Sequence, residues 1–207
     1  MSQSLILDIF RIVVLLYSVV LHELAHGLAA RSLGDMTAER EGRLTLNPIP
    51  HLDLFGSVLL PLLTLGIGGF LFGYAKPVPY NPDALIDRKY GPAKVALAGP
   101  GVNIVLAVLF GLCIRFFGVA MSPVLLQMFA LVVWINLILA VFNLMPVPPL
   151  DGHWLLMTFL PASSYGLKVA LYRYQWLLLA LCIFFIFPAL VPVLGWAFTL
   201  LTGRALF

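Results

Sequence analysis

The segment from residue 12 to residue 30 is apolar except for a short polar stretch, Leu-His-Glu-Leu-Ala-His-Gly, at residues 21–27. Ionisable side chains inside an apolar span cost roughly a few kcal/mol each, so they are rare there and usually functional. On an α-helix, residues i and i+4 lie on one face, so His22 and His26 can direct imidazole nitrogens at a single metal ion. The stretch therefore requires a fold that builds a polar, metal-binding centre within a membrane-spanning helix.

Zinc is the metal that suits this pair of histidines. It binds neutral imidazole readily, and a catalytic zinc site takes three protein ligands and leaves one position open to water. Glu23 follows His22 directly and is placed to accept a proton from that water, the general-base role in metal-assisted hydrolysis. The alternative is that two buried histidines and a glutamate only satisfy one another. The spacing and the apolar surroundings favour the metal.

Composition places the polar stretch in a polytopic membrane protein. The 207 residues are 62% hydrophobic and 10% charged, with a mean hydropathy of +1.04, far from the values of soluble domains. Several apolar runs of about twenty residues are each long enough to cross a hydrocarbon core of about 30 Å. The two cysteines, Cys113 and Cys182, lie in apolar runs, and we expect them to be packing residues.

The basic residues indicate membrane topology. A net charge of +3 and a pI near 9.0 do not predict nucleic-acid binding, because no basic run and no alternation of basic with aromatic residues accompanies them. Nine basic residues lie between the first two long spans or before the last: Arg31, Arg40, Arg43, Lys76, Arg88, Lys89, Lys94, Lys168 and Arg173. The positive-inside rule makes both regions cytoplasmic. The N-terminus and the turn at residues 118–122 then face outward.

The first span is expected at residues 5–33, ending at Gly34, since glycine suits the left-handed position after a helix. In the polar segment that follows, the alternation at residues 43–46 predicts a short membrane-associated β-element. His51 and Asp53 are possible further ligands. A histidine beside prolines in a loop is, however, more often a structural hydrogen-bonding residue.

The apolar segment 54–72 is a poor simple span, because it is interrupted by Pro61, Gly66, Gly68 and Gly69. If it crossed the bilayer, the basic segment 76–94 would face outward, against the positive-inside rule. We therefore expect a membrane-dipping helix that returns to the same side. Residues 73–80 are then expected to form an edge strand able to accept another backbone, since Pro77 and Pro79 suit an edge and not a central strand.

The next two spans are expected at residues 91–117 and 123–144, joined by a short turn. The first of them opens with small residues, Ala98-Gly-Pro-Gly-Val-Asn103, which permit close helix contact. Asn103 is polar at membrane depth. A structural hydrogen bond and a catalytic role are equally open for it.

The third span ends in Asn143-Leu-Met-Pro-Val-Pro-Pro-Leu-Asp-Gly152. Its three prolines remove three backbone donors, and irregular backbone at membrane depth is tolerated only where it lines a buried or watery cavity. Asp151 is thus delivered to a cavity, where its carboxylate needs a partner. A zinc ion held by His22 and His26 is the best partner in the sequence. The alternative is that Asp151 caps the helix expected at residues 154–160.

The remaining chain is expected to give one span at residues 169–187 and a shorter apolar segment at 192–201, separated by Pro188 and Pro192. The shorter segment has too few residues to cross comfortably. We expect residues 1–207 to form a single membrane domain, with a core at about 5–160 and C-terminal helices at about 169–203.

Taken together, these motifs resemble the site-2 protease family of intramembrane zinc metalloproteases. The resemblance rests on His22-Glu-Leu-Ala-His26, on Ala98 to Asn103 and on Asn143 through Asp151-Gly152, and it covers about residues 5–160. It implies an all-α polytopic membrane protein with a three-helix core. It further implies one zinc ion bound by His22, His26 and Asp151, with Glu23 as the base. Asn143 matches a family asparagine that holds the substrate carbonyl or its oxyanion.

The family implies an endopeptidase that cuts in or near a transmembrane segment of another protein, from the cytoplasmic side of a prokaryotic cell membrane. The outer turn is too short for a PDZ domain and no nucleotide-sensing domain follows the last span, as in compact members of the family. A metal transporter or sensor, or an inactive scaffold, are the alternatives. A transporter is expected to supply ligands from symmetric repeats, which the sequence lacks. An inactive scaffold does not need the ligands His22, His26 and Asp151 together with the base Glu23.

Overall fold

The computed structural model describes residues 3–53, 56 and 76–205, and within these ranges the fold is helical and contains no strand. The long helices are α1 (Gln3–Ser32), α4 (Gly91–Phe117) and α5 (Pro123–Asn143). A fourth run is made of α8 (Gln175–Leu181), a π-helical turn (Cys182–Ile186) and α9 (Phe187–Thr202). All four runs are long and apolar enough to cross a membrane, which confirms the predicted all-α polytopic class.

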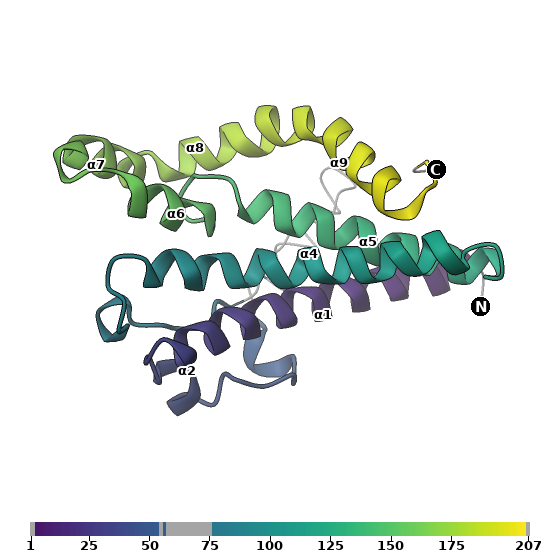
Figure 1. The fold of residues 1–207 in the computed structure, drawn as a ribbon, viewed down its shortest axis with the longest axis horizontal. Coiled ribbons are helices and arrows are strands. Elements are labelled where there is room, and N and C mark those ends of the chain that lie inside the picture. Colours follow the sequence, from purple (N-terminus) through teal and green to yellow (C-terminus); the bar gives the residue numbers. More distant parts are fainter. Residues whose placement is uncertain (1–2, 54–55, 57–75, 206–207) are drawn as a thin grey trace.

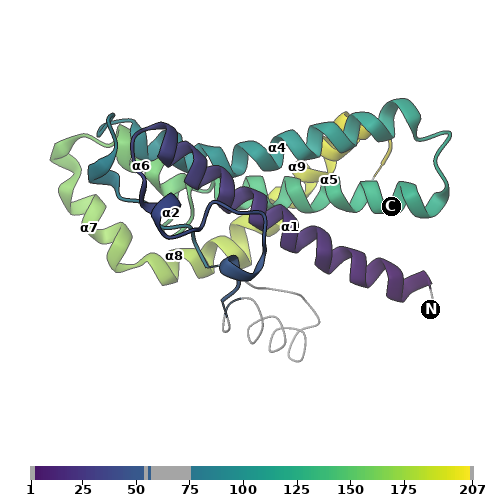
Figure 2. The ribbon, with the colours of Figure 1, turned by 90° about the horizontal axis from the view of Figure 1, so that it is seen from below.

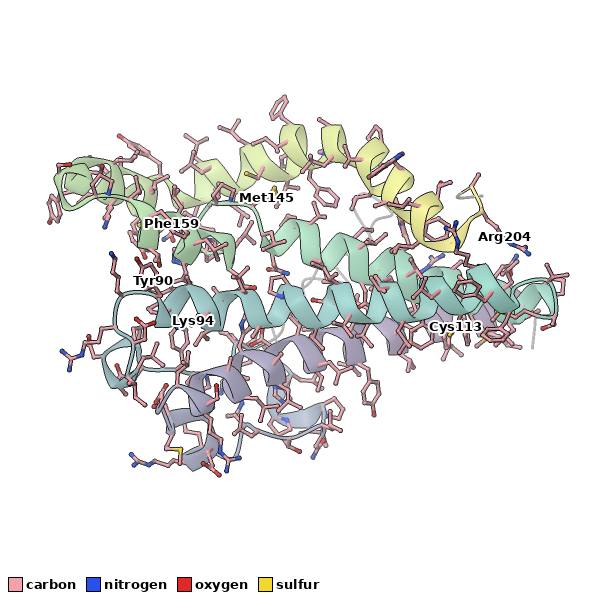
Figure 3. All side chains as sticks on the ribbon, in the orientation of Figure 1. Tyr90, Lys94, Cys113, Met145, Phe159 and Arg204 are labelled. Carbon is pink, nitrogen blue, oxygen red and sulfur yellow. The ribbon has the colours of Figure 1, made fainter. Side chains whose placement is uncertain are left out.

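Most of the short elements gather at one end of the long helices (Figure 1). They include α2 (Thr37–Arg40), α6 (Gly152–Phe159) and α7 (Tyr165–Arg173), with single turns of 3₁₀-helix at Pro82–Ala84 and Ala162–Ser164. A further 3₁₀ turn spans Ile49–His51. Both chain termini and the turn between α4 and α5 lie at the opposite end (Figure 1). Tyr90 and Lys94 mark the first end of α4, and Cys113 and Arg204 lie toward the second (Figure 3).

Helix α4 is the centre of the molecule, because it packs against α1, α5, α6 and α9. Small residues allow these approaches: Ala107 is completely buried in the largest apolar cluster, and a Cβ at Gly111 would lie 2.8 Å from the Cβ of Leu201 on α9. Close backbone approach of this kind is the main source of helix association in lipid. The N-terminal turns of α1 diverge from α4 and α5 (Figure 2), so the tight contact is made by the half of α1 that carries the histidines.

Helix α1 ends as the sequence predicts. Gly34 has a φ of +101°, and the amides of Gly34 and Asp35 donate to the carbonyls of Arg31 and Ala30, each at 3.0 Å. This is the Schellman arrangement that glycine permits. The carboxylate of Asp35 then accepts hydrogen bonds from Thr37 and from the amide of Asn81, which ties the end of α1 to the segment before α4.

The prediction of a β-element at residues 43–46 is wrong, because the structure has no strand there. The amide of Arg43 donates to Ala38, and that of Thr45 donates to the carbonyl of Arg43. These local bonds use the groups that a partner strand would need. The expected edge strand is also absent from its described part, residues 76–80, because the amide of Val78 donates to a side chain. The expected membrane-dipping helix at 54–72 lies outside the described residues except for Gly56.

The expected break between two C-terminal segments is also wrong, since residues 175–202 form one helical run. Pro188 lies in the first turn of α9, directly after the π-turn, where the regular ladder is already interrupted and a missing amide costs little. Pro192 lies inside α9, and a proline inside a membrane helix bends it without ending it. The run accordingly forms an arch over α5 (Figure 1).

Candidate metal centre

Three side-chain atoms from distant parts of the sequence, two on α1 and one at the start of α6, meet at one point. The Nε2 atoms of His22 and His26 lie 3.0 Å apart, and Oδ2 of Asp151 lies 3.0 Å from the first and 3.2 Å from the second. The histidines are adjacent on one face of α1, as their spacing predicts. Asp151 occupies the N-cap position of α6 but makes no cap hydrogen bond. The structure therefore excludes the alternative in which Asp151 only caps this helix.

A chain of buried amides fixes the tautomer of His22. The carbonyl of Val132 can only accept, so the Asn136 atom 2.9 Å from it is the donor Nδ2. Oδ1 of Asn136 then accepts from Nδ2 of Asn103 at 2.8 Å, and Oδ1 of Asn103 faces Nδ1 of His22 at 2.6 Å. Nδ1 of His22 must therefore carry the proton, which leaves a lone pair on Nε2. Ser18 completes the network by accepting from Asn136.

The carbonyl of Val95 fixes His26 in the same way. It lies 2.7 Å from Nδ1 of His26 and can only accept, so this nitrogen carries the proton and Nε2 carries a lone pair. Two imidazole lone pairs and a carboxylate oxygen, all acceptors, thus converge at about 3 Å. Such an arrangement is repulsive without a cation between the three atoms.

The donor set fits zinc. Zinc binds imidazole nitrogen and carboxylate oxygen at about 2.0–2.2 Å, so ligand atoms around a tetrahedral ion lie about 3.3 Å apart, close to the separations found here. Two imidazoles and one carboxylate are three ligands, which leaves the open position of a catalytic site. Among the described residues, no other cluster of histidine, cysteine and acidic side chains has this geometry.

Two glycines make room for the centre. A Cβ at Gly99 of α4 would lie 2.4 Å from Nε2 of His26 and 2.6 Å from Nε2 of His22, so only glycine leaves the space in front of the two nitrogens open. A Cβ at Gly152 would lie 2.2 Å from the carbonyl oxygen of Leu144. Glycine at this position therefore lets the chain after α5 fold back closely enough to deliver Asp151.

The comparisons with known proteins agree with this centre. The profile of Peptidase family M50 matches residues 112–187. YwhC of Bacillus subtilis, which bears a provisional zinc-metalloprotease name, is 38% identical over 178 residues that cover 78% of this chain and 78% of YwhC. The chain belongs to the site-2 protease family. Rip2 of Mycolicibacterium smegmatis, provisionally named in the same way, is 34% identical over 84% of this chain and 66% of Rip2. No solved structure matches the chain.

As a member of the site-2 protease family, the chain is a zinc metalloprotease, and its four membrane-length helices make it a multi-pass membrane protein. Glu23 follows His22 on α1 and is partly exposed. Its Oε2 accepts a hydrogen bond from the backbone amide of Val78 at 2.8 Å. In this site-2 protease the Glu23 carboxylate is thus held by the segment that precedes α4.

Other residues singled out in the sequence have different roles. His51 is completely buried and its Nε2 donates to the carbonyl of Thr45, and neither His51 nor Asp53 belongs to the metal cluster. Asn103 orients His22 through a hydrogen bond. Of the two roles left open for Asn103, this contact supports the structural one over the catalytic one. One amide hydrogen of Asn143 donates to the carbonyl of Leu139 at 2.9 Å. Cys182 packs in an apolar cluster with Met145.

Sequence reasoning missed Ser18, Asn136 and Arg43. The first two were hidden because single polar residues in apolar helices carry no spacing signal, although their depth in the membrane was a usable clue. Arg43 was read as a topology signal, but it is 6% exposed and bonds to backbone carbonyls. The hydroxyl of Tyr80 is also buried. Burial, and then the charge of Asp151, raises the pKa of Tyr80, so this hydroxyl remains protonated.

Proposed function

We propose that the chain is an intramembrane zinc endopeptidase that hydrolyses peptide bonds in or near transmembrane segments of other membrane proteins. The observation that carries the proposal is the meeting of three acceptor atoms beside a carboxylate, within a membrane-length helix. We assign one zinc ion per chain to His22, His26 and Asp151. Bound zinc supplies a Lewis acid that polarises the scissile carbonyl and brings the pKa of a water molecule toward neutral.

Glu23 is the proposed general base. It lies one residue from the ligand His22, accepts the proton of the attacking water and passes it to the leaving amine. Asn103 and Val95 keep the two imidazoles in the tautomer that points lone pairs inward, so no proton has to be removed from Nε2 before zinc can bind. We assign Asn143 to the substrate carbonyl, because a side-chain amide donates a hydrogen bond without titrating.

The proposed orientation places the catalytic end at the cytoplasmic face of a cell membrane. Nine of the twelve basic residues lie between the last turn of α1 and the first turn of α4 or in α7, and α2, α6 and α7 lie at the same end (Figure 1). Under the positive-inside rule this end is cytoplasmic. We further propose that residues 1–207 act as one catalytic domain, with the C-terminal helices packed on the core.

The test uses purified protein and a single-span reporter peptide in vesicles. We expect one zinc per chain in the wild type and in Glu23→Gln, whose amide keeps the shape of the carboxylate but cannot accept the proton. Cleavage is expected to fall by at least about a hundredfold in Glu23→Gln. His26→Ala and Asp151→Ala are expected to lose zinc together with activity.

The possible contrary outcomes point to different errors. Full zinc retention in both His26→Ala and Asp151→Ala would refute the ligand assignment. Loss of zinc in Glu23→Gln would make Glu23 a ligand or a structural residue. A zinc-loaded wild type that moves metal across the vesicle membrane and cuts nothing would identify a transporter, whereas one that does neither would be an inactive scaffold.

A further inference from the structure

Arg43 is the single basic side chain that is buried in the described part of the chain, with an exposed fraction of 6%. A buried guanidinium requires hydrogen-bond acceptors to offset the loss of water. Nη2 of Arg43 donates to the carbonyl oxygens of Lys76 and Pro77, at 2.9 and 3.3 Å. The guanidinium of Arg43 therefore holds two consecutive peptide units of the segment before α4.

The second of these peptide units is the one that contacts Glu23. The carbonyl of Pro77 and the amide of Val78 belong to one planar peptide group, so their directions are coupled. Arg43 holds the carbonyl side of this plane, and Oε2 of Glu23 accepts from the amide side at 2.8 Å. A cation on the carbonyl also polarises the group and strengthens the amide as a donor.

The same two segments dock on the turn of α1 that carries the ligands. A Cβ at Gly27, one residue after His26, would lie 2.5 Å from Leu44 and 3.0 Å from Val78. The carbonyl of His51 accepts from the amide of Lys76 at 2.9 Å, which holds the start of the 76–78 segment. Contacts on both sides of Val78 thus keep its amide in front of Glu23.

We propose that Arg43 is a positioning residue for Glu23, and this inference rests on the proposed function. Arg43 orients the Pro77–Val78 peptide plane, and the plane holds Oε2 of Glu23. Oε1 is then the oxygen that accepts the proton of the attacking water. The hydrogen bonds of Arg43 go to Lys76 and Pro77 and not to the metal ligands, so its effect on the reaction passes through this peptide plane.

Hydrogen exchange tests the contact without relying on activity. Residues 76–80 contain three backbone amides, because Pro77 and Pro79 have none, so the exchange of Val78 can be followed with little overlap. We expect Arg43→Gln to speed exchange of the Val78 amide by about tenfold or more and Arg43→Lys, which keeps the positive charge and its N–H donors, to restore most of the protection. Arg40→Gln removes the same charge from an exposed site and is expected to change nothing.

Turnover per zinc-loaded molecule tests the consequence. We expect kcat to fall by about tenfold to a hundredfold in Arg43→Gln, with KM nearly unchanged, zinc retained and partial recovery in Arg43→Lys. Val78→Pro deletes the amide hydrogen while keeping Arg43, and it is expected to give the same loss of kcat. If Arg43→Gln fails to fold, Val78→Pro still tests the contact between the Val78 amide and Glu23, and a partial loss of protection and of kcat in Arg43→Lys tests the contribution of Arg43.

Two results would overturn the inference: unchanged exchange of the Val78 amide in Arg43→Gln, or unchanged turnover per zinc-loaded molecule in both Arg43→Gln and Val78→Pro. A different result would overturn the proposed function instead. In that case the zinc-loaded wild type cleaves no reporter, while exchange of the Val78 amide still depends on Arg43.

Discussion

The identity of each acceptor and donor decides the chemistry of single residues in this centre. Two carbonyl groups that cannot donate, those of Val132 and Val95, dictate the tautomers of both histidines through at most two intervening amides. The completely buried Asn103 and Asn136 are tolerated at membrane depth because all their polar atoms are paired in this hydrogen-bond network. Removing one member would therefore leave an unpaired group as well as a rotated ligand.

The space in front of the imidazoles gives a first prediction. Gly99→Ala places a methyl group 2.4 Å from Nε2 of His26, so we expect zinc affinity to fall by about tenfold to a hundredfold although every ligand is still present. Gly101→Ala on the same helix is the matched control, because a Cβ there has no atom within 4 Å. Competition with a chelator measures both affinities. Equal affinities would show that the space is not needed by the metal.

Asn143 gives a second prediction. If its amide stabilises the negative charge on the carbonyl oxygen under attack, Asn143→Ala loses roughly 3 kcal/mol of transition-state stabilisation, about a hundredfold in kcat. Zinc content and the thermal midpoint should stay near those of the wild type. Unchanged turnover would leave Asn143 as a structural residue, bonded to Leu139. Asn103 cannot replace it, because both hydrogens of its amide are already bonded, to Asn136 and to the carbonyl of Ser18. Among the described residues, the amide of Asn143 bonds only Leu139.

The sequence predicted residues of this centre wherever a local pattern carried the chemistry. The i, i+4 histidines and the proline-rich approach to Asp151 are such patterns, and both brought the expected atoms together. The partner of each histidine could not be predicted in this way. His22 meets Asn103 across 81 residues and Arg43 meets Lys76 across 33, and contacts at such separations depend on how the helices pack.

At the scale of elements, the sequence predicted the end of α1 correctly but did not predict that the C-terminal helix bends without breaking. The end of α1 at Gly34 follows from a local rule for glycine, and the structure has it. The continuous run over Pro188 and Pro192 does not follow from any rule for proline in water. In a membrane the helix has no alternative that satisfies its backbone, so bending is less costly than breaking. The predicted β-element did not form, because local turns already use its backbone amides.

The cap of α1 gives a pH-dependent prediction. Burial alone would raise the pKa of Asp35, but hydrogen bonds from Thr37 and Asn81 and the charge of Arg40 lower it below its ordinary value of 3.8. A lowered pKa in the folded state stabilises the fold above pH 3.8, and this stabilisation is lost as pH falls through the folded pKa. Asp35→Asn should therefore cost about 1–3 kcal/mol at pH 7 and progressively less below pH 3.8.

Thermal midpoints in detergent at several pH values, with chelator present throughout, measure this difference. Asp83→Asn is the control, because Asp83 is exposed and lies two residues after Asn81, on the segment that Asp35 bonds. A gap between wild type and Asp35→Asn that stays constant down to pH 2.5 would contradict the assignment of the effect to the Asp35 charge.

At the scale of the whole molecule, the two ends of the helix bundle differ in content. One end holds the short helices and the metal centre, and the other holds the termini and the α4–α5 turn (Figure 1). The first three membrane-length helices of the described residues were predictable from hydropathy, whereas the fourth run was predicted as two separate segments. The central place of α4 was not, because it depends on which small residues face which neighbours.

Membrane sidedness gives the last prediction. Ile86, before α4, and Val119, after it, are 84% and 94% exposed. Single cysteines at these positions, in a chain with Cys113 and Cys182 replaced by alanine, should react with an impermeant reagent from opposite sides of the membrane. We expect Ile86→Cys to be labelled from the cytoplasmic side, since it lies among the basic residues. Labelling of both from one side would show that α4 does not cross.

The distance along the chain between the proposed ligands also sets an order of events during synthesis. His22 is made early, whereas Asp151 follows 129 residues later, after the residues of α1, α4 and α5 have all been synthesised. A nascent chain that has inserted its first spans thus holds two of three ligands and a base without a complete centre. The proposed peptidase becomes competent only once the third span and the proline-rich turn behind it have emerged, so the growing chain and the insertion machinery around it are not exposed to an active site.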